Sequence, residues 1–503
     1  IAAAGIDAVP FEVSSQNLNR LAGKLDEVIV FDRVLSNNEV QEGYNNQDNG
    51  NNWNGTERIC PNYLDHIEIV HDSKGLTCRA EEIEIRACAD DECNELYSGD
   101  VDVTLSTLPS SEWDPNPDVT VKDGNTTVDL IHTTPETVTF DATAELTEDI
   151  RCVDGTEQPC EINFKDVGIL VDGDDSDNDL ESNITTQIAG KPTNKEPNSK
   201  MQRIHVVRKD KNTGACIPAL NSTTRNATFN YQVDNGTEDN TIIVNGETRT
   251  ELENSGSSGK IELEFDSEGS APFNATSKDA GMYSIEVDMN IPVTNSSGKE
   301  TGETIHVNNT SNSFVVRPLA VFVDAVNTDG NLNPQAQNAS GDKFAIAGKD
   351  FELQFKSLRW TSERDTPPSN GQWDACGDTN ITDAPNSDFA RLPKWNIGQP
   401  NANLQKPNSG TNGTLNYNNG NVAFAKGKYQ ANATATYEEV GIIQIQKNDI
   451  NDFLGKQVNL CSPYIGRFVP DHFQVQTPLL DHRSKLFDCS DIFTYLDEQW
   501  SLE

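Results

Sequence analysis

Hydrophobic and polar residues alternate with a period of two along most of the chain. The pattern is clear in EEIEIRA at residues 81–87, in KIELEFD at residues 260–266 and in YSIEVDMNI at residues 283–291. Such alternation places apolar side chains on one face of a β-strand and polar ones on the other. Clusters of Gly, Pro, Asn and Asp separate these segments. The pattern predicts an all-β protein built from tandem immunoglobulin-like β-sandwich domains.

Helical periodicity is rare, and the best candidate is LSNNEVQEGYN at residues 35–45. Ser36 can cap the first turn, and Glu39 follows at the third helical position. This spacing is typical of a capping box, in which the two residues bond to each other's backbone amides. We therefore expect one short helix near the start of the chain.

Changes in composition suggest where the domains begin and end. We expect a C-terminal part of a truncated domain at 1–45, a polar linker at 46–59, a β-sandwich at 60–146, a second β-sandwich with an acidic loop insertion at 147–317, a third that ends in GRFVPDHF at 318–478, and the start of a further truncated β-domain at 479–503.

Charge narrows the range of partners. The chain has 80 Asp and Glu against 38 Lys and Arg, a net charge of −42. Such a field repels nucleic acids and anionic membrane surfaces and attracts cations. No apolar run is long enough for a membrane span. The residues are only 35% hydrophobic, which favours several small cores over one large core.

The ten cysteines suggest disulfides. Six of them fall into close pairs, which we take as disulfide candidates: Cys60 with Cys78, Cys88 with Cys93, and Cys152 with Cys160. Their spacing does not fit a zinc ribbon and suits bonds that close hairpins. Cysteines paired in disulfides are typical of proteins exported to an oxidising compartment. The other four, Cys216, Cys376, Cys461 and Cys489, allow three pairings, among which the sequence does not choose.

An acidic run in the second predicted sandwich is a candidate calcium site. It contains Asp172, Asp174, Asp175, Asp177, Asp179 and Glu181. Closely spaced carboxylates can supply the six to eight oxygens that calcium takes. The run does not have the spacing of an EF-hand, and a solvated acidic loop is the simpler interpretation. Calcium is the only cofactor that the sequence suggests.

The stretch LCSPYIGRFVPDHFQV at residues 460–475 raises the question of catalysis. His472 and Asp471 resemble a base and its orienting carboxylate, but neighbouring side chains on an extended strand point to opposite faces. We favour a structural clasp in which Arg467 bonds to Asp471. No catalytic residue is predicted, and we expect the chain not to be an enzyme.

Aromatic residues offer two further predictions. Asp279 and Gly281 form a turn before Tyr283, a pattern typical of the tyrosine corner of immunoglobulin-like sandwiches. Tryptophans stand in polar segments, where they could stack on sugars or, in the interpretation that we favour, seal small β-cores. These are Trp53, Trp113, Trp373 and Trp395.

Two stretches resemble known families. GKLDEVIVFDRVLSNNEVQEGYN at residues 23–45 is similar to the closing strand and helix of a LamG or concanavalin A-like jelly roll. The segments GLTC, RACADDEC and GRFVPDHF, in this order, resemble proteins of the MshQ type, which are encoded with the mannose-sensitive haemagglutinin (MSHA) type IV pilus of bacteria. Members of that family often carry a second Cys shortly after the position of Cys216, where this chain has Asn230 and Tyr231.

The second resemblance implies an extracellular protein of the bacterial cell surface. The function that we expect is a non-enzymatic structural or adhesive one, in which a disulfide-locked β-stalk presents a LamG-like head. A carbohydrate-binding adhesin module is the alternative. The implied partners are pilus or other cell-surface proteins and possibly glycans, with no nucleic acid among them.

Overall fold

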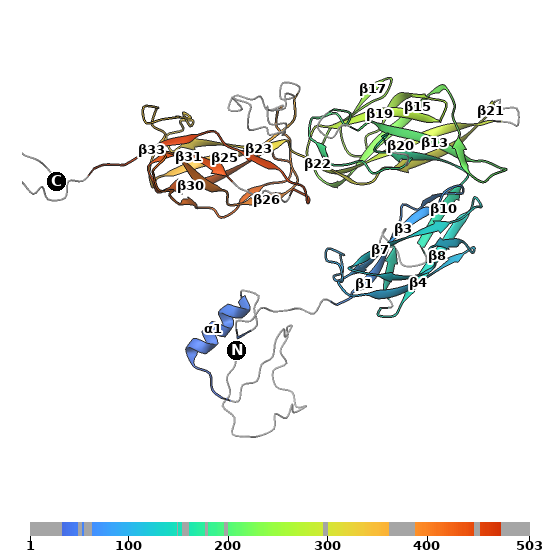
Figure 1. Cartoon of the computed structure of the whole chain (residues 1–503), viewed down its shortest axis with the longest axis horizontal. Coiled ribbons are helices and arrows are strands. Elements are labelled where there is room, and N and C mark those ends of the chain that lie inside the picture. Colours follow the sequence, from blue (N-terminus) through green and yellow to red (C-terminus); the bar gives the residue numbers. More distant parts are fainter. Residues whose placement is uncertain are drawn as a thin grey trace, which may run out of the picture. The chain divides into compact units, whose positions relative to one another are not determined.

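The computed structural model of the chain is shown in Figure 1. It describes residues 33–48, 53–54, 63–147, 149–152, 160–176, 180–195, 200–294, 300–361, 388–446 and 453–473. These residues form one α-helix and 33 β-strands, which confirms the all-β prediction. The expected strand of a jelly roll before residue 33 and the expected domain at 479–503 lie outside the described residues.

The helix α1 runs from Asn37 to Asp48. Its first turn is closed by the predicted capping box, because Glu39 accepts a hydrogen bond from the Ser36 amide at 2.8 Å and the Glu39 amide donates to the Ser36 hydroxyl at 3.3 Å. Arg33 adds an ion pair with the Glu39 carboxylate at 2.6 Å. Together, these bonds from Arg33 and Ser36 lower the pKa of Glu39 to about 2.

The first sandwich consists of two five-stranded sheets, with strand orders β5-β7-β3-β1-β9 and β2-β10-β8-β4-β6. The strands are β1 (His66–Val70), β2 (Lys74–Leu76), β3 (Glu81–Cys88), β4 (Val101–Leu108), β5 (Glu112–Asp114), β6 (Asp118–Val121), β7 (Asn125–Ile131), β8 (Thr137–Ala144), β9 (Ile150–Cys152) and β10 (Cys160–Lys165). Because β9 and β10 pair with β1 and β2, the sandwich extends beyond residue 146, where the sequence analysis ended it.

The second sandwich begins at once with β11 and ends at Arg317. Its sheets have the orders β11-β13-β19-β16-β17, with β14 beside β13, and β12-β22-β20-β15-β18, with β21 beside β20. The strands are β11 (Val167–Asp172), β12 (Gln187–Ile188), β13 (Gln202–Lys209), β14 (Cys216–Pro218), β15 (Thr223–Asn235), β16 (Ile242–Asn245), β17 (Arg249–Leu252), β18 (Gly259–Phe265), β19 (Ser270–Ser277), β20 (Gly281–Thr294), β21 (Glu300–Thr310) and β22 (Phe314–Arg317).

The third sandwich follows after two residues. Its sheets have the orders β28-β30-β25-β23-β32 and β24-β33-β31-β27, and β26 and β29 form a separate pair. The strands are β23 (Ala320–Asn327), β24 (Ala345–Ile346), β25 (Asp350–Leu358), β26 (Trp395–Gly398), β27 (Asn401–Lys406), β28 (Leu415–Tyr417), β29 (Val422–Phe424), β30 (Gln430–Tyr437), β31 (Gly441–Gln446), β32 (Asn459–Cys461) and β33 (Ile465–Val469).

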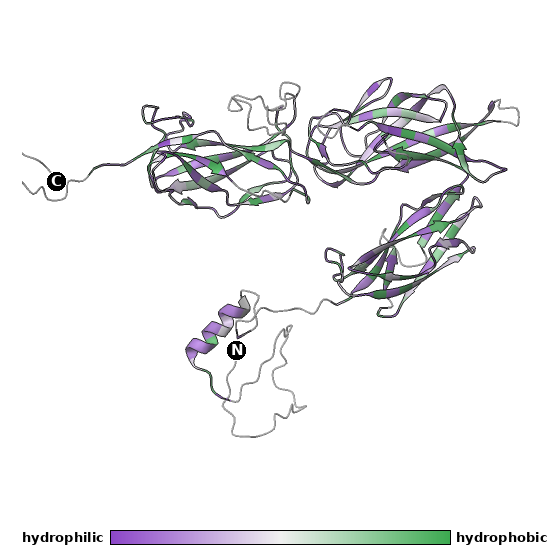
Figure 2. Cartoon of the chain, in the orientation of Figure 1, coloured by the Kyte–Doolittle hydropathy of each residue, from purple (hydrophilic) through white to green (hydrophobic). Residues whose placement is uncertain are grey.

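Alternation along the strands produces the cores. In β18, Ile261, Leu263 and Phe265 are buried, and the residues between them are exposed. Figure 2 shows the same alternation of hydrophobic and hydrophilic positions along strands of all three sandwiches. Tyr283 forms the predicted corner, since its ring is fully buried and its hydroxyl donates to the Ala280 carbonyl at 3.2 Å. The bond holds the turn that follows β19 against the start of β20.

Parallel pairs join early and late strands within the sandwiches. In the first, β9 runs parallel to β1 and β10 to β2. In the third, β32 runs parallel to β23 and β33 to β24. The chain therefore runs in the same direction through β1 and β9, and again through β23 and β32.

Candidate functional site

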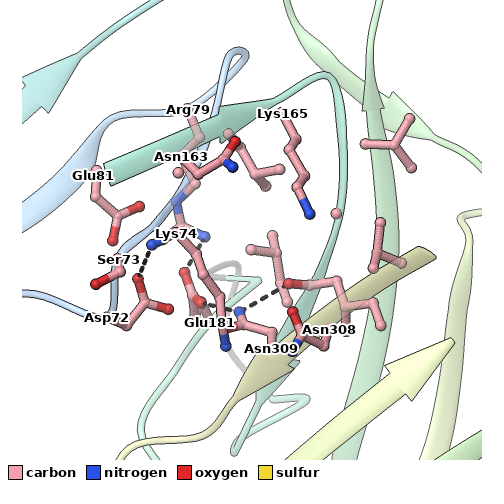
Figure 3. Close-up of a pocket in the computed structure, with 17 residues that line it drawn as sticks. Asp72, Ser73, Lys74, Arg79, Glu81, Asn163, Lys165, Glu181, Asn308 and Asn309 are labelled. Carbon is pink, nitrogen blue, oxygen red and sulfur yellow. Dashed lines mark hydrogen bonds and ion pairs between the residues drawn. The ribbon is translucent and has the colours of Figure 1, made fainter. Parts of the chain in front are cut away.

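A pocket of about 290 Å³ lies beside the segment Asp72–Glu81, the start of β11 and the strand β21 (Figure 3). All of its lining residues belong to one compact unit, which comprises residues 72–81, 131–138 and 162–503. The pocket is lined by basic and acidic side chains. The basic residues are Lys74, Arg79 and Lys165, and the acidic residues are Asp72, Glu81 and Glu181. Three asparagines, Asn163, Asn308 and Asn309, supply amide groups, and none of the lining residues is aromatic.

A disulfide fixes the segment that forms one wall of the pocket. Cys78 is bonded to Cys216, 138 residues away in the sequence, at the start of β14. The Thr77 hydroxyl donates to the Asp166 carboxylate at 2.6 Å, and Leu76 packs with Leu170 and Val207 beneath it. The wall is thus held by a covalent bond, a hydrogen bond and a small apolar cluster.

This bond corrects the expected pairing of Cys78 with Cys60. Cys78 pairs instead with one of the four cysteines that the sequence left open, and Cys60 lies outside the described residues. Proximity along the chain misled the prediction, because β14 is brought to Cys78 only by its pairing with β13. The second Cys absent near Asn230 and Tyr231 is therefore not needed as a partner for Cys216.

The other expected disulfides close short loops as predicted. Cys88 is bonded to Cys93 and Cys152 to Cys160. Cys461 is disulfide-bonded as well, whereas Cys376 and Cys489 lie outside the described residues.

Inside the pocket, Glu181 is the central acceptor. Arg79 forms an ion pair with its carboxylate at 3.0 Å, and the Asn309 amide donates to it at 3.2 Å. The same amide of Asn309 donates to the Ile169 carbonyl at 2.9 Å, which ties β21 to β11. In Figure 3 the ammonium group of Lys165 extends into the open space, opposite Asn309. The pocket can therefore offer a cation and amide groups to a small polar ligand.

The residues predicted to bind calcium are distributed over different partners. Asp172 is buried, with its carboxylate 3.4 Å from His205 Nε2. Asp174 forms an ion pair with Lys200 at 2.5 Å, and Asp175 lies 3.5 Å from Arg203. Burial disfavours the charge of Asp174, but hydrogen bonds from Lys200 and Ser176 outweigh this effect and lower its pKa. Asp177 and Asp179 lie outside the described residues, so calcium binding stays a prediction.

The predicted clasp between Arg467 and Asp471 is not found between these two described residues. Asp471 lies in a bend after β33, where its carboxylate contacts His472 Nδ1 at 3.1 Å. The bend brings together two side chains that an extended strand would have separated. Both are more than half exposed, at 56% for Asp471 and 71% for His472. A contact this exposed contributes little to stability, because water competes for both partners.

Two of the four tryptophans seal cores, as favoured above. Trp113 packs edge-on against Phe140 with ring centroids 6.3 Å apart, and Trp395 packs edge-on against Phe453 at 5.1 Å. Both side chains are buried. Trp53 is half-buried, and Trp373 lies outside the described residues.

A buried ionic joint connects the second and third sandwiches, and no motif in the sequence predicts it. Asp279, fully buried after β19, accepts hydrogen bonds from the Arg391 amide at 2.8 Å and from Arg391 Nε at 2.7 Å. Arg359 reaches the same carboxylate at 3.3 Å. Arg391 also bonds to Asp239, an exposed residue of the second sandwich.

Burial affects the two arginines of the joint differently. It lowers the pKa of Arg359, and Asp279 only partly restores it. For Arg391 the burial effect is outweighed by hydrogen bonds to Asp279 and Asp239, which raise its pKa. The only sequence signal was the turn containing Asp279, because nothing in the sequence relates it to arginines 80 and 112 positions away.

These features define a tandem β-sandwich protein with immunoglobulin-like domains, as the domain models also indicate. Residues 149–307 match the first Ig-like domain of DUF6701, residues 317–436 its second domain and residues 439–503 its third domain. The chain thus contains the three DUF6701 domains. Residues 64–147 match a further domain of unknown function, DUF8613. The strands β9 and β10 fall in the DUF6701 match but complete the sandwich of the preceding domain.

Several solved structures are similar at low identity. Invasin, a bacterial integrin-binding protein, is 14% identical, with a TM-score of 0.18; the match covers 79% of this chain and 60% of invasin. The D0-D1 domain of intimin is 13% identical, with a TM-score of 0.21, over 50% of this chain and 96% of that structure. Domains 1–6 of the surface layer protein SbsC are 12% identical, with a TM-score of 0.15, over 84% of this chain and 42% of that structure. None of the curated proteins compared with the chain matches it.

Helices that could cross a membrane are not found: the described residues contain none with the necessary length and apolar character.

Proposed function

We propose that the chain is an exported, non-enzymatic stalk on the bacterial surface. It would belong to an MSHA-type pilus system, because the sequence resembles the MshQ-type proteins of that system. Its sandwiches hold a binding head, similar to a LamG domain, away from the cell and pass mechanical load between head and anchor. The observation that carries this proposal is the joint at Asp279, where one buried carboxylate of the second sandwich binds two guanidinium groups of the third.

Such a joint suits a stalk because it resists bending between neighbouring domains. A flexible linker would let two domains move independently, whereas here only Pro318 and Leu319 separate the strands β22 and β23. Three disulfides with both partners described support export to an oxidising compartment.

A deletion strain of a bacterium that carries the gene tests this function. Antibodies should label the full-length protein on intact cells, and the deletion should reduce adhesion to a surface. Complementation with Asp279→Ala should restore labelling but not full adhesion, whereas Asp239→Ala, which removes only the exposed partner of Arg391, should restore both. Labelling that requires permeabilised cells, or adhesion unaffected by the deletion, would contradict the proposal.

A carbohydrate-binding role is the second candidate, and the pocket is the observation that favours it. Its amides and the Lys165 ammonium suit the hydroxyl and carboxylate groups of an acidic sugar, although stacking aromatics are absent from its lining. A glycan array probed with the oxidised chain should then show binding that Lys165→Ala abolishes and Lys260→Ala, an exposed change on β18, does not. Repeating the assay in calcium and in EDTA tests the acidic loop. Glycan binding that is present in calcium and lost in EDTA would show that the glycan binds through calcium.

A further inference from the structure

A group of metal-binding side chains lies in the first sandwich, apart from the pocket and the joint. His66 begins β1, Cys88 ends β3 directly opposite it in the strand register, and Cys93 follows in the next turn. Their donor atoms, one ring nitrogen and two sulfurs, all lie within 4.8 Å of one another. In the structure the two sulfurs are joined as a disulfide. No function described so far uses this group.

His66 is oriented as a metal ligand usually is. Its ring is buried, 2% exposed, and its Nδ1 lies 3.0 Å from the Asp65 carboxylate. With Nδ1 hydrogen-bonded to a carboxylate, Nε2 is the ring nitrogen left to bind a metal. A carboxylate in this position fixes the tautomer and makes the imidazole a better donor.

The loop between the two cysteines keeps its shape by bonds other than the disulfide. The Asp90 carboxylate accepts hydrogen bonds from the amides of Glu92, Asn94 and Glu95 at 2.9–3.0 Å. The Cys93 amide donates to the Asp90 carbonyl at 3.2 Å. Arg151, which is not part of the loop, forms an ion pair with Asp91 of the loop at 2.9 Å. We therefore expect both sulfurs to stay beside His66 when the disulfide is reduced.

The charge around His66 favours a cation. Asp65 contacts His66 directly, and Asp90 and Asp149 interact with it electrostatically. The same carboxylates attract a divalent metal ion, whose charge compensates the thiolates that it binds.

We propose that His66, Cys88 and Cys93 form a zinc site when the disulfide is reduced, so that this corner of the sandwich carries either a disulfide or Zn²⁺. A dithiol supplies two electrons and two protons to the Cys88–Cys93 bond and becomes a disulfide itself. Zn²⁺ then replaces the two thiol protons, which pass to solvent. Two thiolates and an imidazole are ligands that zinc prefers, and water or a neighbouring carboxylate completes the tetrahedron.

The test compares matched pairs of cysteine variants in the full chain. Wild type, C88S/C93S and C152S/C160S are reduced with dithiothreitol, freed of it under anaerobic conditions and titrated with Zn²⁺ against a chromophoric chelator. C152S/C160S is the matched control because it also removes one short disulfide. The described residues around Cys152 and Cys160 form no metal-binding group with them. C88S/C93S should bind one zinc fewer per chain than the control.

A second variant keeps the test decisive if C88S/C93S folds poorly. His66→Asn retains both cysteines and should weaken zinc binding at this site at least tenfold. Zinc should protect Cys88 and Cys93 from alkylation in the reduced wild type and fail to do so at the same concentration in His66→Asn, as read by peptide mass spectrometry. Equal zinc content in C88S/C93S and C152S/C160S, or equal protection in wild type and His66→Asn, would overturn the proposal.

Discussion

Asp279 of the second sandwich and Arg391 of the third are joined by both backbone and side-chain hydrogen bonds. The Arg391 amide and Nε both donate to the Asp279 carboxylate, and the Ala280 amide donates to the Arg391 carbonyl at 3.0 Å. A side-chain contact alone would leave the two domains free to rotate about it. The added backbone bond fixes their orientation, so the joint acts as a rigid connection within this unit.

Removing the carboxylate of the joint should destabilise the second and third sandwiches strongly. Asp279→Ala leaves the guanidinium groups of Arg359 and Arg391 partly buried without it, which costs about 3–5 kcal/mol of the free energy of unfolding. Asp239→Ala should cost less than about 1 kcal/mol, because Asp239 is 66% exposed. Urea denaturation of the full chain measures both. If both variants lost the same free energy of unfolding, the burial of Asp279 would not be the source of its contribution to stability.

A glycine supports the same joint from its other side. Gly190 has φ +82°, and a Cβ there would overlap Arg359 Cγ and lie 2.5 Å from the Trp360 carbonyl oxygen. Gly190→Ala should therefore lower the melting temperature and loosen the joint, which accelerated proteolysis between the second and third sandwiches would reveal. Gly256→Ala is the control, because Gly256 has φ +80° but nothing within 4 Å of the added Cβ. The joint is not constrained at Gly190 if both variants behave alike.

The long-range disulfide should contribute more stability than a short one. Cys78–Cys216 closes a loop of 138 residues and Cys152–Cys160 a loop of 8. The entropy that a disulfide removes from the unfolded chain grows with loop length. C78S/C216S should therefore lower the free energy of unfolding by about 4–5 kcal/mol, and the loss in C152S/C160S should be smaller by about 2 kcal/mol. Calorimetry of the oxidised proteins compares the two. A larger effect of C152S/C160S would mean that native-state contacts, and not loop entropy, dominate.

A buried carboxylate in β23 makes stability depend on pH. Asp324 is 2% exposed, and burial raises its pKa despite hydrogen bonding to the Ala325 amide. A carboxylate with a raised pKa in the folded state favours folding when it is protonated. Its contribution is complete below the pKa of the unfolded chain, about 3.9, and is lost as the pH rises through the folded pKa.

Asp324→Asn should therefore be more stable than wild type at pH 7, with the difference shrinking as the pH falls towards 4. Melting temperatures of both proteins across this range measure the effect, and the Asn oxygen can still accept from the Ala325 amide. A constant difference between the two proteins at all pH values would show that Asp324 does not change its protonation there.

The sequence determined the local features of this protein. Alternation at Ile261, Leu263 and Phe265 predicted strands because the side-chain period of a strand is two. The capping box at Ser36 and the corner at Tyr283 were predictable as well, since each depends on residues within four positions of one another. The disulfides across short loops followed as well, because their cysteines are only 5 and 8 positions apart.

Only the tertiary structure decided which distant residues meet. Cys216 reaches Cys78 because β14 pairs with β13, and Asp279 meets Arg391 because the second sandwich packs against the third. A pocket lined by Arg79, Lys165 and Glu181 likewise requires segments that are far apart in the sequence. A hydrophobic pattern shows which face of a strand is buried but not which strand or domain covers it, so these contacts depend on packing that periodicity does not encode.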